Sequence, residues 1–290
     1  MAKESTQTAD MENEKVAPRL RPIVLKELIA EKNPKLATRF PRFVYRLMNR
    51  LLHIDEVNEI IRKYGHLNGI PFIEAVLEYF DVKVIFNGEE YLPHEGKYIF
   101  ASNHPLGGFD GLMLIKGVTD HLGKSLFLVR DELTKIPPLA ELFIPINKFG
   151  DQRRSANLIN SAYESDSQII IFPAGLASRK IKNRIVDLPW QKHFIQKSVE
   201  HHRDVIPVFI SGQNSRLFYW VANFRKRIGI RINFEMFLLS DELFKNKGKT
   251  FMINFGKPIP WTRFDRTQSP MEWAGKVKDV VYELDGKPNK

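Results

Sequence analysis

The sequence predicts an α/β fold in which a mixed β-sheet is flanked by helices and preceded by an N-terminal helical segment. The first observation is a set of short apolar runs typical of buried strands, at 98–102, 126–129, 168–172 and 205–210. The second is a set of helix-length stretches between these runs, near 110–120, 152–165 and 190–202. Alternation of this kind favours helices packed on the faces of one sheet. The third is the length of 290 residues, which suffices to bury the core of a full enzyme.

The remaining elements divide the chain into three parts. Residues 1–17 are polar and aperiodic, which predicts a disordered tail. Residues 18–80 form the helical segment. Its helices are expected over 22–33, 39–52, 55–64 and 71–80. Residues 81–290 form the α/β domain, which opens on an alternating strand at 82–86 and has a late strand at 251–255.

The composition excludes several classes of protein and of site. Hydrophobic residues make up 43% of the chain, which excludes wholesale disorder, and 17 glycines and 17 prolines exclude a collagen-like chain. The absence of cysteine excludes disulfides, thiolate metal sites and a cysteine nucleophile. The histidines show no His-Glu-x-x-His or similar spacing, so no catalytic metal is expected.

Basic residues outnumber acidic ones by 44 to 34, which gives a net charge of +10 at pH 7. An excess of this size indicates an anionic partner, either nucleic acid or a membrane surface with acidic lipids. The sequence has no apolar window of the roughly 20 residues that a spanning helix needs. Its first residues lack the basic and apolar regions of a secretory signal. We therefore expect a cytoplasmic protein that binds the inner face of the cell membrane peripherally.

A basic amphipathic helix is predicted over 39–52. Its arginines recur at three- and four-residue steps, at Arg39, Arg42, Arg46 and Arg50. Apolar residues fill the intervals and no acidic residue interrupts them. Two interpretations remain open: a helix packed in the core with one solvated face, or an interfacial helix on anionic lipid.

A second stretch, 214–231, combines aromatic and basic side chains. Its apolar part is Leu217-Phe-Tyr-Trp-Val-Ala222 with Phe224, and its basic residues are Arg216, Arg225, Lys226, Arg227 and Arg231. This mixture favours the headgroup region of a bilayer. Nucleic-acid binding uses similar residues, but no nucleic-acid-binding signature accompanies them, so no nucleic-acid partner is expected. A core helix is the alternative.

The strongest chemical signal is the segment Ser102-Asn-His-Pro-Leu-Gly-Gly-Phe-Asp-Gly111. A strand runs into His104, and Asp110 opens an apolar helix, so both side chains lie at the carboxyl end of a strand, where α/β sheets hold their sites. Gly107 and Gly108 let the backbone double back, so that the carboxylate can reach the imidazole. His104 is then predicted to be the general base for a hydroxyl that the substrate brings, with Asp110 orienting its ring. The alternative is a glycine turn beside a structural histidine.

A second block, Phe172-Pro-Ala-Gly-Leu-Ala-Ser-Arg179, follows another apolar strand about 70 residues later. Gly175 permits close approach of the backbone to a ligand, and Arg179 can pair bidentately with a phosphate or a carboxylate. Taken alone, this pattern is also that of a strand ending in a Pro-Gly turn.

Together the two blocks resemble the glycerolipid (lysophospholipid) acyltransferase superfamily over roughly residues 80–260. That family carries His-x4-Asp after a strand, usually preceded by asparagine, as Asn103 is here. This chain has His-x5-Asp, and the paired glycines would absorb the extra residue as a bulge. The second block resembles the family's Phe-Pro-Glu-Gly-Thr-x-Ser-Arg, which helps to hold the acyl acceptor. Phe172, Pro173, Gly175, Ser178 and Arg179 match that motif, whereas Ala174 replaces its glutamate.

Two weaker blocks extend the resemblance. Val205-Ile-Pro-Val-Phe-Ile-Ser-Gly212 resembles the family's late strand with a proline, which lines the site. Phe143-Ile-Pro-Ile-Asn-Lys-Phe-Gly150 stands where the family carries a motif with an arginine. Either Lys148 or Arg153 would take the place of that arginine, and both are equally consistent with solvated charges.

The resemblance implies an O-acyltransferase. His104 and Asp110 would be its catalytic residues, and backbone amides near Gly107 and Gly108 would stabilise the tetrahedral oxyanion. The donor would be the thioester of an acyl carrier protein or of coenzyme A, with no further cofactor. The residues implied to bind acceptor or donor are Asn103, Gly107, Gly108, Lys148, Phe172, Pro173, Gly175, Ser178 and Arg179.

The two blocks look more like a bacterial subgroup termed hemolysin-like, or acyltransferases of ornithine and glycine lipids. This likeness implies that the acceptor is the free 3-hydroxyl on the fatty chain of an N-acylated amino acid. Two other functions remain open. One is a 1-acylglycerol-3-phosphate acyltransferase. The other is a basic lipid- or nucleic-acid-binding protein with a decayed site, which the alanine at 174 and the longer His–Asp spacing would fit.

Overall fold

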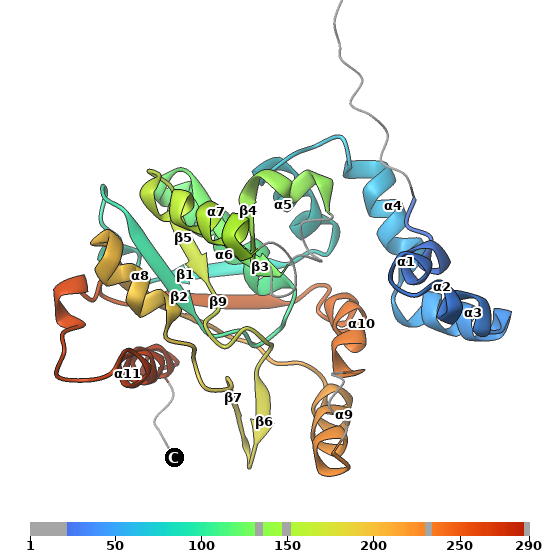
Figure 1. The fold of residues 1–290 in the computed structure, drawn as a ribbon. Helices are drawn as coiled ribbons and strands as arrows, with labels where there is room; N and C mark the ends of the chain where they lie inside the picture. Colours follow the sequence, from blue (N-terminus) through green and yellow to red (C-terminus); the bar gives the residue numbers. More distant parts are fainter. Residues whose placement is uncertain (1–21, 131–135, 147–151, 230–233, 287–290) are drawn as a thin grey trace, which may run out of the picture.

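The computed structural model describes residues 22–130, 136–146, 152–229 and 234–286. Its centre is a seven-stranded sheet in the order β1-β9-β8-β2-β5-β3-β4 (Figure 1). The strands are β1 Lys83–Asn87, β2 Tyr98–Ser102, β3 Ser125–Arg130, β4 Phe143–Ile146, β5 Gln168–Ile171, β8 Asp204–Ile210 and β9 Thr250–Phe255. The β8–β9 pair is antiparallel and the other neighbours in this sheet are parallel, which confirms the predicted mixed sheet. The predicted tail, 1–17, lies outside the described residues.

Helices cover both faces of the sheet. One face carries α5 (Ile70–Tyr79) and α6 (Phe109–Leu122), and the other carries α7 (Gln152–Glu164), α8 (His193–His201) and α11 (Pro270–Glu283). Successive residues of a strand point to opposite faces, so Phe100 of β2 joins the first core and its neighbour Ile99 joins the second. Because both faces are buried, the central strands are continuous apolar runs, which is why their positions could be predicted.

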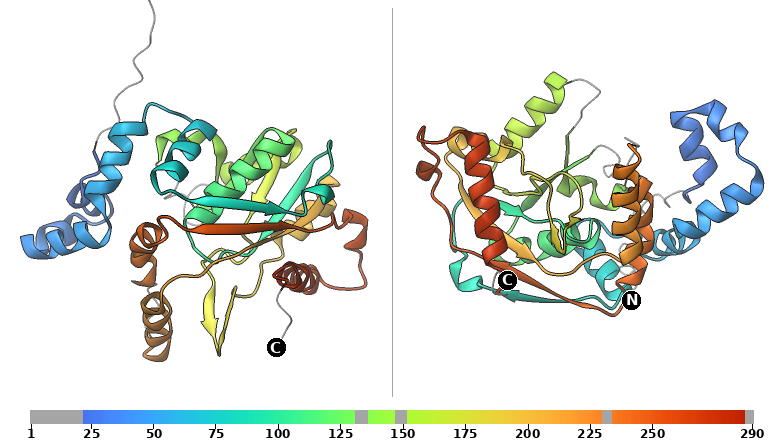
Figure 2. Two further views of the ribbon diagram at one scale, coloured as in Figure 1. Left: turned by 180° about the vertical axis from the view of Figure 1, so that it is seen from behind. Right: turned by 90° about the horizontal axis from the view of Figure 1, so that it is seen from below.

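The N-terminal helices form a group beside the sheet. These helices are α1 (Leu25–Lys32), α2 (Pro34–Arg39), α3 (Arg42–Leu51) and α4 (Ile54–Tyr64), and they project from one end of the molecule in both views (Figures 1 and 2). The fifth helix of the predicted segment 18–80, α5, packs instead in the main core. In the described parts of the chain, every helix is too short or too polar to cross a bilayer.

A histidine fastens this helical group to the rest of the protein. The Nε2 atom of His53, between α3 and α4, lies 3.2 Å from Oδ1 of Asp241 on α10 (Leu238–Lys245). The His53 ring also stacks on Phe244 of α10, with the ring centroids 4.1 Å apart. The N-terminal helices therefore contact α10, the helix that also packs over the loop after β2.

The structure decides between the interpretations of the two basic segments. No residue of α3 is buried, and Phe43 and Leu47 are 67% and 65% exposed, so the reading as a core helix is wrong for this segment. Helix α9 (Arg216–Arg227) is mixed: its inner face is buried through Phe218, whereas Trp220 is 60% exposed and stacks on the exposed Phe224. Arg231 lies outside the described residues.

Several elements were not expected from the sequence. A short hairpin, β6 (Arg179–Ile181) with β7 (Arg184–Val186), contains three basic residues and is exposed or half-buried except at Arg179, so no apolar run marks it. Helix α11 does carry a signal, because Ser269 and Glu272 form a capping box at its start. The short 3₁₀ helices are η1 Glu89–Tyr91, η3 Pro137–Leu142, η4 Phe234–Phe237 and η5 Trp261–Arg263.

Asn103 joins two strands at the edge of the sheet where the chemistry is expected. The regular β2–β8 pairing ends at Ser102 and Val208. Beyond it, the Asn103 side chain acts like one more strand residue: its Nδ2 donates to the carbonyl oxygen of Ile210 (2.9 Å), and its Oδ1 accepts from the Ile210 amide (2.7 Å). The side-chain amide is thus fully used in holding the two strand ends together.

We predict that Asn103→Ala lowers the free energy of unfolding by about 2 kcal/mol, because both buried backbone groups of Ile210 lose their partner. Denaturant unfolding measures the change. Asn183→Ala, at the exposed tip of the β6–β7 hairpin, is the matched control and should alter stability by less than about 0.5 kcal/mol. Equal stability of the two variants would contradict the role of Asn103 as a clamp.

Candidate functional site

The two residues predicted to do chemistry meet at the carboxyl end of β2. His104 lies in the loop after this strand, and Asp110 lies in the first turn of α6. The Nδ1 atom of His104 is 2.7 Å from Oδ2 of Asp110; the carboxylate side chain is 0% exposed and the imidazole 17%. The longer spacing between the two residues therefore does not separate them.

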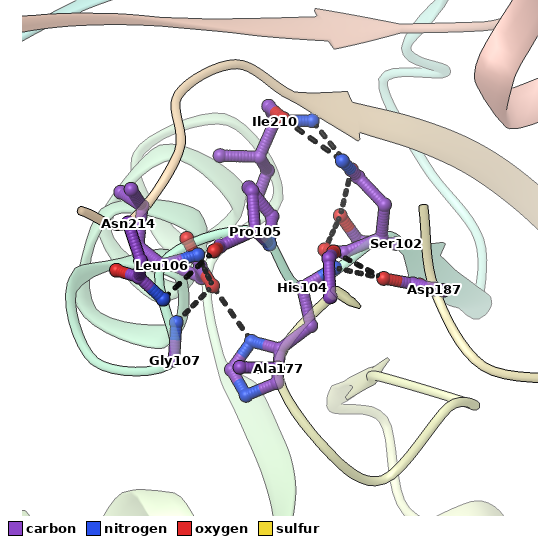
Figure 3. A network of polar contacts seen from close by, with 12 residues as sticks. Ser102, His104, Pro105, Leu106, Gly107, Ala177, Asp187, Ile210 and Asn214 are labelled. Atoms are coloured by element: carbon purple, nitrogen blue, oxygen red, sulfur yellow. Dashed lines mark hydrogen bonds and ion pairs between the residues drawn. The ribbon is translucent and has the colours of Figure 1, made fainter. Parts of the chain in front are cut away.

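The extra residue is accommodated by a tight loop around the carboxylate. Oδ2 of Asp110 accepts hydrogen bonds from the amides of Leu106 (2.9 Å) and Gly107 (2.8 Å) (Figure 3). Gly107 has a φ of +80°, a left-handed conformation that an L-residue adopts only with strain. Asp110 thus contacts both the loop amides and the imidazole through the same oxygen, Oδ2.

Nδ1 of His104 and Oδ2 of Asp110 lie at hydrogen-bond distance but are not aligned as a straight hydrogen bond. Such contacts in enzymes without substrate often straighten only when the substrate binds. A small rotation of the ring would suffice, because the two atoms are already at hydrogen-bond distance.

Phe172 sets the plane of the imidazole. Its ring, just after β5, stacks on the His104 ring with centroids 4.1 Å apart and an angle of 15° between the planes. One face of the imidazole is therefore covered by apolar surface and Nδ1 faces Asp110. Among the described residues, Nε2 has no recorded partner. This nitrogen is the one placed to exchange a proton with a substrate.

The glycine pair has a packing role. A Cβ atom on Gly107 would lie 2.8 Å from a methyl carbon of Leu239, and one on Gly108 would lie 3.1 Å from a methyl carbon of Leu243. Both leucines belong to α10, so the glycines allow this helix to sit directly on the loop. Because the Gly107 amide donates to Asp110, it is not available to a ligand in this conformation.

The second block meets the first through its serine. The amide of Ser178 donates to the carbonyl oxygen of His104 (2.7 Å). Pro173 is buried, and its carbonyl accepts from the amide of Gln191 (3.0 Å). Gly175 is exposed, has a φ of +66° and has no neighbour within 4 Å of a Cβ position. Of the residues in this block that were predicted to bind a substrate, Ser178 thus supports the backbone of His104, whereas Gly175 faces open space.

Arg179 pairs with a carboxylate of the protein itself. Its Nη2 lies 2.9 Å from Oε1 of Glu235, which is 0% exposed, and Arg225 donates through Nε to Oε2 of the same carboxylate (2.8 Å). Burial lowers the pKa of Arg179, and the charge of Glu235 opposes this change. The bidentate pairing expected for Arg179 is therefore engaged within the chain, through a partner 56 residues away that no motif indicated.

Two other predictions concern a basic residue, Lys148 or Arg153, and the absence of a catalytic metal. Lys148 lies outside the described residues, and its rival Arg153 is an exposed residue of α7. In the described ranges, no three His, Asp or Glu side chains gather as they would around a metal ion.

A buried carboxylate that the sequence did not indicate stands behind His104. Asp187, at the end of the β6–β7 hairpin, accepts through Oδ1 from the amide of His104 (3.2 Å) and from Oγ of Ser178 (2.5 Å). Its Oδ2 accepts from Nε1 of Trp190 (2.9 Å). Burial raises the pKa of Asp187, and these hydrogen bonds act in the opposite direction. Figure 3 shows Asp187 on one side of the His104 backbone and the imidazole on the other.

Comparisons with known proteins show which family the chain belongs to. The model of a family described as Acyltransferase matches residues 27–287. The lyso-glycine lipid O-acyltransferase of Bacteroides thetaiotaomicron is 45% identical over 260 residues, which are 89% of this chain and 96% of that protein. The lyso-glycine lipid O-acyltransferase of Phocaeicola vulgatus is 44% identical over 264 residues, which are 90% and 95% of the two chains.

Among solved structures, the 1-acyl-sn-glycerophosphate acyltransferase of Thermotoga maritima aligns with a TM-score of 0.44 and 16% sequence identity, covering 84% of this chain and 97% of that one. The family match and the two curated relatives extend over most of the chain. The protein therefore belongs to the acyltransferase family.

Proposed function

We propose that this acyltransferase moves a fatty acyl group from an acyl thioester to the free hydroxyl of a lyso-amino-acid lipid, of the N-acyl glycine type. The observation that carries the proposal is the His104–Asp110 pair, in which Nδ1 is held 2.7 Å from a buried carboxylate while Nε2 contacts no polar partner in the part of the chain that the structure describes. The names of the two curated relatives support the choice of acceptor.

The pair performs the transfer as a general base and then a general acid. The Nε2 atom of His104 takes the proton of the acceptor hydroxyl as its oxygen attacks the thioester carbonyl carbon. The tetrahedral intermediate then collapses: the carbon–sulfur bond breaks, and the imidazolium returns the proton to the leaving thiolate. Asp110 stabilises the imidazolium between these two steps. The products are an ester and a free thiol, and no covalent enzyme intermediate is needed.

The oxyanion of the intermediate requires a nearby donor. Both Gly107 and Gly108 were expected to supply backbone amides, but the Gly107 amide donates to Asp110. We therefore assign this role to the amide of Gly108, which precedes the first turn of α6. The positive end of the helix dipole lies at that point and favours developing negative charge.

Two features of the second block fit an acceptor other than glycerol phosphate. Ala174 removes the hydroxyl acceptor that the family's glutamate would provide. Arg179, which was expected to bind a phosphate or a carboxylate, is already paired with Glu235. The donor is proposed to be an acyl carrier protein or coenzyme A, since both present the acyl group as a phosphopantetheine thioester.

We predict that the purified protein esterifies an N-(3-hydroxyacyl) glycine with a mass-labelled acyl thioester, and that His104→Ala lowers kcat/KM by about 10³-fold because the general base is lost. Mass spectrometry of the diacylated product measures the rate. His94→Ala is the matched control, since His94 is exposed in the loop before β2, at the opposite edge of the sheet; its rate should be unchanged.

Parallel reactions test the competing functions. Esterification of 1-acylglycerol 3-phosphate in preference to the glycine lipid would identify a glycerolipid enzyme instead. Binding of liposomes or oligonucleotides with no ester formed from any acceptor would favour a binding protein. Full activity of His104→Ala would disprove the general-base mechanism.

The same proposal includes docking on the inner face of the cell membrane. Arg42, Phe43, Arg46, Leu47 and Arg50 all belong to the exposed surface of α3, with the basic and apolar side chains at helical spacing. A face of this kind suits an interface with anionic headgroups, where the aromatic and aliphatic side chains enter the acyl boundary. The exposed Trp220 and Phe224 of α9 provide a second point of contact.

We predict that replacing Arg42, Arg46 and Arg50 with Gln weakens sedimentation with anionic vesicles by roughly 100-fold, because each arginine contributes about 1 kcal/mol near such a surface. Activity on detergent-dispersed acceptor should persist. High salt should weaken binding of the parent protein, and zwitterionic vesicles should not retain it.

The matched control removes the same charge elsewhere. Arg263, Arg266 and Lys276 are exposed around η5 and α11, at the end of the sheet away from α3 (Figure 1). Their triple Gln variant should bind anionic vesicles like the parent. Equal loss in both triple variants would indicate a response to net charge alone, and no loss in the α3 variant would rule out this docking face.

A further inference from the structure

Asp187 is the meeting point of three segments that are distant in sequence. Its carboxylate contacts the loop after β2 through His104, the loop after β5 through Ser178, and the segment before α8 through Trp190. Its backbone contacts α11: the amide donates to the hydroxyl of Tyr282 (2.7 Å), and the carbonyl accepts from Nζ of Lys278 (2.7 Å). The residue is 1% exposed, so these contacts replace water entirely.

The contacts close a ring around the backbone of His104. The amide of His104 donates to Oδ1 of Asp187, and the hydroxyl of Ser178 donates to the same oxygen. The amide of Ser178 in turn donates to the carbonyl of His104. Both backbone groups of His104 are therefore fixed, the amide by Asp187 and the carbonyl by Ser178, and these two residues are bonded to each other. The Cα atom of His104 cannot shift relative to the acceptor-side motif without breaking at least one buried hydrogen bond.

The charge of Asp187 is compensated only in part. The groups that face its carboxylate directly are neutral donors, the amide of His104, the hydroxyl of Ser178 and the indole of Trp190. Of the charged and titratable groups nearby, Lys278 and Tyr282 come from α11, and both contact the backbone of Asp187. Three donors on an acceptor-only group fit the ionised form.

We propose that Asp187 is a positioning residue for acyl transfer, which fixes the backbone of His104 against the Ser178 loop and adds a second negative charge across the main chain from the imidazole. This inference rests on the general-base role proposed above. The imidazole is neutral before the hydroxyl is attacked and positive afterwards, so a fixed negative charge within the site lowers the energy of the charged state more than that of the neutral one.

This role differs from that of Asp110. Asp110 touches Nδ1 and determines which way the ring faces. Asp187 lies on the other side of the backbone (Figure 3) and acts through the position of the main chain and through its field. Loss of the backbone anchor displaces the base, and displacements of about 1 Å in an active site cost up to about 100-fold in rate.

The test is Asp187→Asn, which preserves the shape of the side chain and removes its charge. We expect kcat to fall by about 10- to 100-fold, while KM for both substrates stays within about threefold, because Asp187 does not touch substrate. The acid limb of the kcat/KM profile should move to lower pH by about half a pH unit or more, because the imidazole loses its proton more readily once a nearby negative charge is gone.

A second measurement does not depend on catalysis. An NMR titration of ¹³C-labelled histidine, with the His104 signal assigned by its absence in His104→Ala, should show the same displacement of the protonation midpoint in Asp187→Asn. If the parent fails to acylate the glycine lipid, the proposed function fails, and the titration still decides whether Asp187 acts on the imidazole.

Two further variants separate the electrostatic effect of Asp187 on His104 from its effect on the stability of the fold. The new amide of Asp187→Asn faces the Nε1–H of Trp190, and two opposed donors will destabilise the fold. The double variant, Asp187→Asn with Trp190→Phe, removes that conflict and should be more stable than Asp187→Asn alone. Its acid limb should remain displaced. Trp190→Phe alone should have the acid limb of the parent. Asp204→Asn removes one charge at the far edge of the sheet, where β8 begins, and should also keep it.

The outcomes are decisive in both directions. A displaced limb and midpoint in both Asp187→Asn variants, but not in Trp190→Phe or Asp204→Asn, support the positioning role. A parental pH limb and midpoint in the double variant would overturn it and leave Asp187 with a purely structural role. The same displacement in Asp204→Asn would assign the effect to the net charge of the protein.

Discussion

The carboxyl edge of the sheet is both buried and polar, and this combination governs the site. Buried amides and carbonyls must find partners within the protein, because an unpaired group costs free energy comparable to a lost hydrogen bond. Here the partners are side chains from other loops: Asn103 pairs with the backbone of Ile210, Asp110 with two loop amides, and Asp187 with the amide of His104. Asn103, Asp110 and Asp187 thus together hold the loop that carries His104.

The same requirement explains why the site withstands a departure in spacing. The glycine pair lets the loop after β2 bend until two amides point at Asp110, and the extra residue is accommodated in that bend. Helix α10 then packs directly against Gly107 and Gly108 through its leucines. The loop and helix α10 together therefore hold His104 in place. The position of the Asp110 carboxylate matters more than the number of residues between His104 and Asp110.

Helix α10 also links the site to the N-terminal helices. One of its faces lies on the glycine loop, and its residues Asp241 and Phe244 contact His53 at the start of α4. The exposed basic and apolar face of α3 is thus attached to the catalytic loop through a single helix. The proposed docking surface and the candidate site are therefore joined by packed side chains.

Local sequence determined the strands and the chemistry that stands at their ends. The central strands are buried on both faces, so they are continuous apolar runs that are readable without any partner. The His–Asp block and the Phe-Pro-Ala-Gly block could be predicted for a related reason: each directly follows a buried strand, and α/β sheets hold their sites at the carboxyl ends of strands. The basic face of α3 was also legible, because helical spacing alone puts its arginines on one side.

Only the tertiary structure decided how these residues are used. Whether α3 was core or surface depended on what packs against it, which the helix's own pattern does not encode. Arg179 proved to be paired with Glu235, and His104 proved to be anchored by Asp187; both carboxylates come from distant segments with no motif of their own. Pairing across such separations depends on the burial that folding creates, because buried charges and amides must be matched, whereas in the extended chain water satisfies them all.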